Sequence, residues 1–139
     1  MSESDLRLLL VKHWVEIAEE DHWAARTALE ATPPKLSIVG FTTQQMAEKY
    51  LKAFLELQAA EIPLTHNLRI LVTRCAEIEP AFAGLADDVA ALDEVGITPR
   101  YPPVRLTPQK ARQGLERAEK VAVLVRELLP DSVLPPDEE

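Results

Sequence analysis

Apolar residues recur at intervals of three and four through most of this chain, and prolines interrupt the pattern at only a few places. Such spacing places the apolar side chains on one face of an α-helix, whereas a proline inside the pattern cannot continue the helix. No strand-like alternation of useful length and no internal repeat is found. The pattern therefore predicts an all-α fold in which each helix buries its apolar face against a neighbour.

Five helices are expected between the interruptions. They are expected at residues 5–30, at 36–60, from an N-cap at Thr65 to Pro80, over a shorter stretch from Leu85 to Gly96, and from Thr107-Pro108 to Leu129. Short connections between them favour antiparallel neighbours. The predicted architecture is an up-and-down four-helix bundle with an additional short helix.

The expected cap at Thr65 bears on the neighbouring histidine. The Thr65 hydroxyl can accept a hydrogen bond from a backbone N–H of the first turn. His66 would then lie in that first turn, where the helix dipole favours a neutral imidazole that can serve as a base. An ordinary surface histidine is the alternative interpretation.

Length and composition favour one domain, expected over residues 1–130, with a flexible acidic tail at 131–139. The single cysteine, Cys75, cannot form an internal disulfide, and no segment approaches the ~20 apolar residues that span a bilayer. These features are typical of a cytoplasmic protein without membrane contact.

The charge is uneven along the chain. The net charge is −8, which disfavours an extended nucleic-acid track. Residues 98–126, however, hold seven lysines and arginines against two glutamates, a net +5. A local anion site is therefore possible, and a solvated helix face of mixed charge is the alternative.

Familiar catalytic and metal-binding motifs are not found. The chain has no CxxC, HExxH, GxSxG or glycine-rich phosphate loop. His13 and His22 lie nine residues apart on one helix, half a turn out of phase, so they cannot share a metal. We expect neither a metal nor a cofactor.

The segment FTTQQMAEKYLKAFL, residues 41–55, has two distinct faces. One face is wide and apolar, while Gln45, Glu48, Lys49 and Lys52 fall within about 100° of each other on the other side. This polar face could hold a ligand or could join helices through a buried network. Lysines buried against Glu48 or another carboxylate would favour the network, and lysines lining a cleft with Arg100 would favour a ligand site.

Several motifs together resemble the HEPN domain family, of the small stand-alone prokaryotic type. They are Trp14, Ala18 and Asp21 on the first helix, QQMAEKYLKAFL at 44–55, THNL at 65–68 and RYP at 100–102. The resemblance covers roughly residues 10–129. It implies a helical bundle, commonly a homodimer, often paired with a minimal nucleotidyltransferase in toxin–antitoxin or substrate-binding systems. The family name itself refers to nucleotide binding.

The sequence departs from the ribonuclease branch of that family, which uses an Arg-x4-6-His motif. Here this spacing occurs only as Arg7…His13, at the start of the chain, where six residues turn the two side chains to different sides of a helix. In addition, Asn67 stands where Asp is common. We therefore expect no catalytic residues.

Residue chemistry and resemblance together predict a ligand site that offers amide groups, cations and an aromatic ring, as a nucleotide requires. Its residues are Gln45, Lys49, Lys52, His66, Arg100 and Tyr101. The predicted function is a nucleotide-binding or nucleotidyltransferase-partner module without activity of its own. One alternative is a metal-independent ribonuclease toxin, acting on RNA through His66 and Arg100. Another is a purely structural dimeric scaffold.

Overall fold

The structure is a computed structural model that describes residues 1–97 and 106–136. Its α-helices are α1 (Glu3–Glu30), α2 (Leu36–Leu57), α3 (Leu68–Ile78), α4 (Ala86–Ile97) and α5 (Pro108–Leu128), joined by the 3-10 helices η1 (Pro80–Leu85) and η3 (Asp131–Val133). No strand occurs in these two ranges. The all-α prediction is confirmed.

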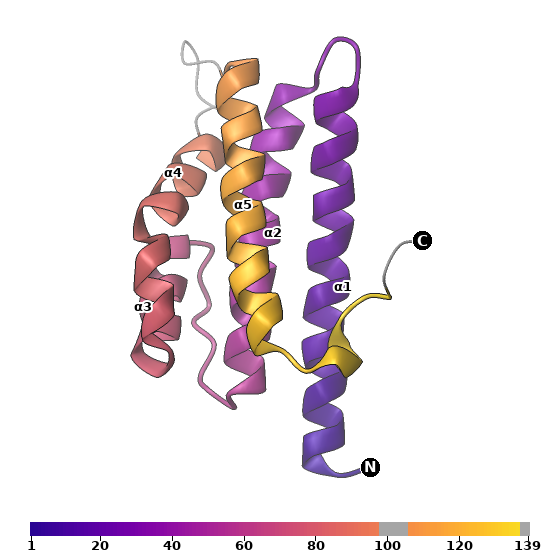
Figure 1. The fold of residues 1–139 in the computed structure, drawn as a ribbon, viewed down its shortest axis with the longest axis vertical. Helices are drawn as coiled ribbons and strands as arrows, with labels where there is room; N and C mark the ends of the chain where they lie inside the picture. Colours follow the sequence, from indigo (N-terminus) through magenta and orange to yellow (C-terminus); the bar gives the residue numbers. More distant parts are fainter. Residues whose placement is uncertain (98–105, 137–139) are drawn as a thin grey trace.

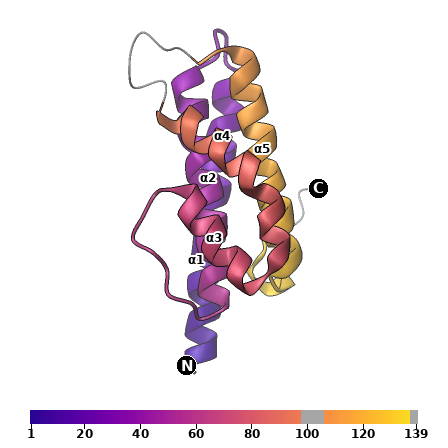
Figure 2. The same ribbon diagram turned by 90° about the vertical axis from the view of Figure 1, so that its left-hand side faces the viewer.

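Helix α2 holds the bundle together, because it contacts α1, α3, α4 and α5. Figure 1 shows α1, α2 and α5 as three long helices side by side, with α3 and α4 flanking them. The segment 58–67 returns along the bundle before α3 begins, so that α3 and α4 cover one side together (Figure 2). No helix in the described ranges is long and apolar enough to cross a membrane.

The core forms where the apolar face of α2 meets its neighbours. Tyr50, Leu51 and Phe54 are buried along this face. The rings of Phe54 and Phe82 lie 4.7 Å apart between centroids, which joins α2 to η1. Burial of such large side chains contributes about 1.5–3 kcal/mol each. This packing fixes which face of α2 is left for polar residues.

The helix caps confirm one prediction and correct another. The Thr107 side chain accepts a hydrogen bond from the Lys110 N–H, with Pro108 at the first helical position, as predicted for α5. The expected cap at Thr65 is wrong. Asn67 caps α3 instead, and its side chain accepts from the N–H groups of Arg69 and Ile70 at 2.9 and 3.2 Å.

Two consequences follow from the later start of α3. The Thr65 hydroxyl accepts from the Asn67 N–H at 3.0 Å, so it supports the true cap from outside the helix. His66 also precedes the helix, and the dipole argument for a neutral imidazole therefore does not apply to it. Asn is the stronger N-cap residue of the two, which is consistent with the observed choice.

The segment after α5 also differs from expectation. We expected a flexible tail from residue 131, but Asp131–Val133 form η3, and Val133 is buried in the core. Figure 1 shows this segment crossing from the end of α5 to α1. Residues 131–133 therefore pack with the bundle, because burial of the apolar Val133 side chain lowers the free energy of the folded state.

Candidate functional site

The polar face of α2 is folded inward around one carboxylate. The Glu48 side chain is fully buried. It accepts hydrogen bonds from Lys49 Nζ at 2.8 Å and Lys52 Nζ at 3.2 Å. Its second oxygen lies 2.8 Å from Nδ1 of His66, in the segment before α3. A buried carboxylate requires such partners, because an isolated charge in the interior is costly.

These partners determine the ionisation of Glu48. Burial alone would raise the pKa of its carboxyl group, but the hydrogen bonds from Lys49 and His66 and the charges of both lysines outweigh burial. The pKa of Glu48 therefore lies below its ordinary value, and the group is a carboxylate at neutral pH.

The motif residues of α1 lie on the same side of the bundle. The two lysines lie over the ring of Trp14, with Nζ atoms 5.9 and 5.7 Å from the ring centroid. Desolvation raises the pKa of the nearby Asp21 to about 6, although the charge of Lys49 opposes the shift. The first-helix motif and the 44–55 motif thus belong to one cluster.

The two glutamines extend this network toward α4. Gln44 Nε2 donates to the carbonyl of His66 at 2.6 Å and to Asp93 at 3.3 Å. Gln45 donates to Gln44 at 2.8 Å and accepts from Lys49 at 3.2 Å. The side chains at 44–52 therefore connect α2 with the 58–67 segment and α4.

Asp93 is the member of this network that the sequence did not predict. Its carboxylate accepts the first free N–H of α3, from Leu68, at 3.0 and 3.2 Å. It comes from α4, where acidic residues such as Asp93 and the adjacent Glu94 have the appearance of a solvated surface. No local pattern marks it, because its partners lie 25 and 49 residues away in the chain.

A pocket of about 460 Å³ lies beside the network. It is lined by residues from α2, α4 and the segment just before α3, namely Phe41, Gln44, Gln45, His66, Asn67, Asp93 and Gly96. Glycine is required at position 96, since a Cβ there would lie 2.9 Å from Cγ of Gln44. The pocket therefore offers amides, a carboxylate and two rings on a well-supported wall.

The structure divides the six predicted ligand-binding residues into three groups. Gln45 and His66 line the pocket. Lys49 and Lys52 pair with Glu48, and their side chains are only 17% and 10% exposed. Arg100 and Tyr101 lie outside the described residues. The buried pairing favours the network interpretation for the two lysines, and a ligand role for the six residues stays a prediction.

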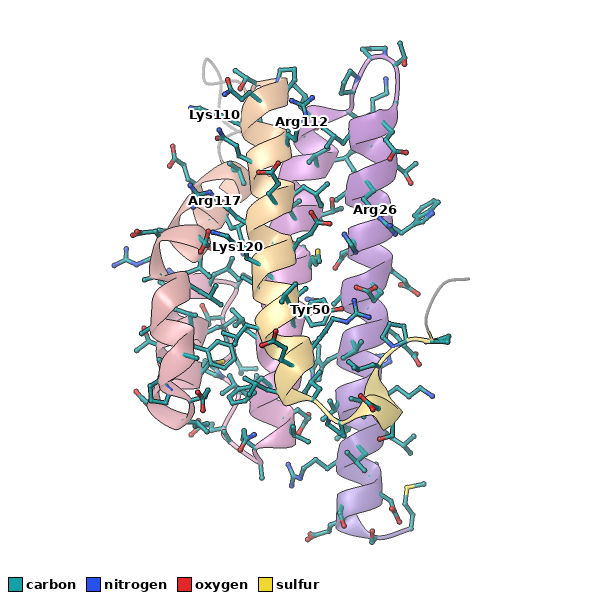
Figure 3. The ribbon with its side chains drawn as sticks, viewed as in Figure 1. Arg26, Tyr50, Lys110, Arg112, Arg117 and Lys120 are labelled. Atoms are coloured by element: carbon teal, nitrogen blue, oxygen red, sulfur yellow. The ribbon has the colours of Figure 1, made fainter. Side chains whose placement is uncertain are left out.

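Other charged residues outside this network make ion pairs of their own. Arg7 binds Glu56 of α2, with 3.1 Å to its carbonyl and 3.7 Å to its carboxylate, while His13 is exposed. Arg117 and Lys120 of α5 are labelled in Figure 3. Their side chains lie 3.1 and 3.7 Å from the carboxylate of Asp88. Within residues 1–97 and 106–136, no group of three or more His, Cys, Asp or Glu could hold a metal.

The described structure is an all-α bundle. Polar side chains of α2 contact α1, the segment before α3, and α4. Comparison with known proteins agrees with this class: the HEPN domain family matches residues 11–128. The chain belongs to the HEPN domain family. The crystal structure of an archaeal HEPN homologue is similar, with a TM-score of 0.68 and 26% identity over 85% of this chain and 96% of that one. Among curated proteins, none matches this sequence.

Proposed function

We propose that this HEPN protein is a nucleotide-binding module that takes its ligand in the pocket between α2, α4 and the segment just before α3. The observation that carries the proposal is the composition of the pocket wall. Gln45 and Asn67 present amide groups, which can read the edge of a base. Phe41 and His66 present rings on which a base can stack.

The charges around the pocket favour the base and the sugar over the phosphate as the main recognised groups. None of the described residues that line it is a lysine or an arginine. The two lysines nearest in sequence are held by Glu48 at 2.8 and 3.2 Å. We therefore expect a nucleoside and its monophosphate to bind with affinities within about tenfold of each other.

Calorimetric titration of the purified protein with the four nucleosides and their 5′-monophosphates tests this proposal. Phe41→Ala should weaken binding about tenfold, because base stacking on an aromatic ring contributes about 1–3 kcal/mol. Ile38→Ala is the matched control. Phe41 and Ile38 both belong to α2 and are similarly exposed, at 42% and 47% respectively, but Ile38 does not line the pocket. The absence of binding for every nucleoside and nucleotide would contradict the proposal.

A second candidate function is the binding of a partner nucleotidyltransferase over the opening of this pocket. Phe41 lines the pocket, and Ile38 on α2 and Ile70 on α3, the helices beside the pocket, also expose apolar surface. Exposed apolar patches are typical of protein contacts. Co-expression with a minimal nucleotidyltransferase should yield a complex that Ile38→Asp and Ile70→Asp together disrupt, whereas nucleoside binding in the pocket would persist.

In this proposal the protein has no catalytic activity of its own. Incubation with RNA in the absence of metal separates it from the ribonuclease alternative. Cleavage that is lost in His66→Ala would favour the ribonuclease. The homodimer expected for the family is a further proposal, which light scattering of the purified protein would test.

A further inference from the structure

A second cavity, of about 510 Å³, runs along α1 and shares no lining residue with the nucleotide pocket. One wall is formed by successive turns of α1, including Glu16, Glu20 and Trp23. The other wall is the C-terminal segment, where Leu134 and Pro135 face the helix. Figure 1 shows this segment lying across the lower half of α1. We refer to this cavity as the α1 groove.

The α1 groove is acidic, and most of its charge is uncompensated. It is lined by Glu16, Glu19 and Glu20 against Lys12 alone. Glu16 and Glu20 are exposed, and their side chains make no hydrogen bond or ion pair with any other described residue. Glu19 is held in place, since the Tyr50 hydroxyl donates to it at 2.6 Å. An incoming cation would therefore find two available carboxylates beside one fixed carboxylate.

The same groove has an exposed aromatic ring and an apolar wall. Trp23 is 63% exposed, which is unusual for an indole that could pack against its own chain. A cation over such a ring is attracted by its π face. Leu134 and Pro135, which are half-buried, offer a surface for an aliphatic stem. Lysine and arginine combine such a stem with a charged end.

We propose that the α1 groove binds a lysine- or arginine-bearing segment of a partner protein. The charged ends of its side chains meet Glu16 and Glu20, one of them lies over the Trp23 ring, and the aliphatic stems pack along Leu134 and Pro135. A strongly solvated inorganic cation would not use the ring or the apolar wall. The net negative charge of the groove, the Trp23 ring and the apolar wall of Leu134 and Pro135 together favour an organic cation.

The test is a fluorescence anisotropy titration of the whole protein with a labelled peptide of alternating lysine and glycine at about 0.15 M salt. Trp23→Ala should weaken binding about fivefold, the effect of losing roughly 1 kcal/mol of cation–π attraction. Glu16→Gln with Glu20→Gln should weaken it about tenfold. Both changes concern exposed side chains, so the urea midpoint of each variant should match that of the unchanged protein.

The control for charge is Glu77→Gln with Glu94→Gln, which changes the net charge equally but on α3 and α4. It should alter binding less than about twofold. The assignment is overturned by any of three results: no saturable binding below about 1 mM, an equal loss in the Glu77/Glu94 variant, or unchanged binding in Trp23→Ala. Equal affinity for spermidine would overturn the assignment to a protein segment.

Discussion

The Glu48 cluster and the α1 groove contain the same kinds of residue in opposite states. Each combines carboxylate, lysine and tryptophan. In the Glu48 cluster, one fully buried carboxylate contacts Lys49, Lys52 and His66 within 3.2 Å. In the groove, Glu16 and Glu20 are exposed and pair with no other described residue. The difference shows that composition alone does not separate a structural network from a binding surface, whereas the internal pairing of its charges does.

Removal of Glu48 should give the largest difference between the two regions. Glu48→Ala leaves two lysines without their counter-charge in a buried site, which should cost about 3–5 kcal/mol of unfolding free energy. Glu20→Ala in the groove should change it by less than about 0.5 kcal/mol. Urea unfolding followed by circular dichroism measures both. Similar losses in the two variants would remove the distinction between network and binding surface.

A pair of glycine substitutions sharpens the comparison on the pocket side. An added Cβ at Gly96 would lie 2.9 Å from Cγ of Gln44, whereas one at Gly84 would meet nothing within 4 Å. Gly96→Ala should therefore cost about 1–3 kcal/mol of unfolding free energy, because the stem of Gln44 must move. Gly84→Ala should be neutral or stabilise by up to about 1 kcal/mol. Urea unfolding measures both, and equal effects would show that Gln44 is not held tightly.

Most of the fold could be predicted from the sequence because its signals are local. Periodicity and proline positions predicted the five helices, and Thr107-Pro108 marked the start of α5 correctly. The cap of α3 was missed because Thr65 and Asn67 both have capping side chains and lie two residues apart. The choice also involves Asp93, which binds the Leu68 N–H from another helix. Val133 was missed because a short apolar stretch among prolines has no periodicity.

The candidate site could be predicted only in part, for a related reason. The helical wheel gathered Gln45, Glu48, Lys49 and Lys52 on one face, which the structure brings together. It could not show that the face is covered, because the covering groups come from distant segments. Trp14, which belongs to α1, contacts both lysines through its ring. His66 contacts Glu48, which lies 18 residues earlier in the chain. Long-range partners decide whether a polar face is solvated.

Asp21 tests whether the Glu48 cluster tolerates a further carboxylate. Desolvation raises the pKa of Asp21 from 3.8 to about 6, and repulsion by Glu20 and Glu48 adds to the shift. Because the folded pKa lies above the unfolded value, ionisation of Asp21 removes stability as the pH rises from about 4 to 6. Asp21→Asn should therefore stabilise the protein at pH 7 by about 1 kcal/mol, a value reduced for partial solvent exposure.

The gain from Asp21→Asn should disappear near pH 4, where Asp21 is largely protonated in the folded state. Urea unfolding at the two pH values measures it. Glu16→Gln, also on α1 and exposed, is the matched control and should show no such pH-dependent gain, because Glu16 is not among the charges that shift the pKa of Asp21. A loss of stability in Asp21→Asn at pH 7 would instead mean that attraction to Lys49 dominates at this position.

His22, which contacts Glu19 of the α1 groove, provides the test with the smallest expected effect. Its ring nitrogens lie 3.7 Å from Glu19 and 3.1 Å from Glu119, and Arg26 and Arg126 are the nearby cations. The nearby Glu19 carboxylate raises the pKa of His22 above 6.5; burial opposes the shift, and the hydrogen bond with Glu119 adds to it. For a raised histidine pKa, the stabilisation is complete below pH 6.5 and is lost as the pH rises through the folded pKa.

The unfolding free energy should therefore fall by about 0.5 kcal/mol more in the unchanged protein than in His22→Gln between pH 6 and pH 8.5. Urea unfolding at a series of pH values measures this difference, and subtracting the two curves removes the contribution of the other histidines. Glu19 does not interfere, because its lowered pKa confines its own titration to acidic pH. Parallel curves would show that Glu19 is positioned by Tyr50 alone. In that case the fixed carboxylate of the groove would keep its position even where His22 is neutral.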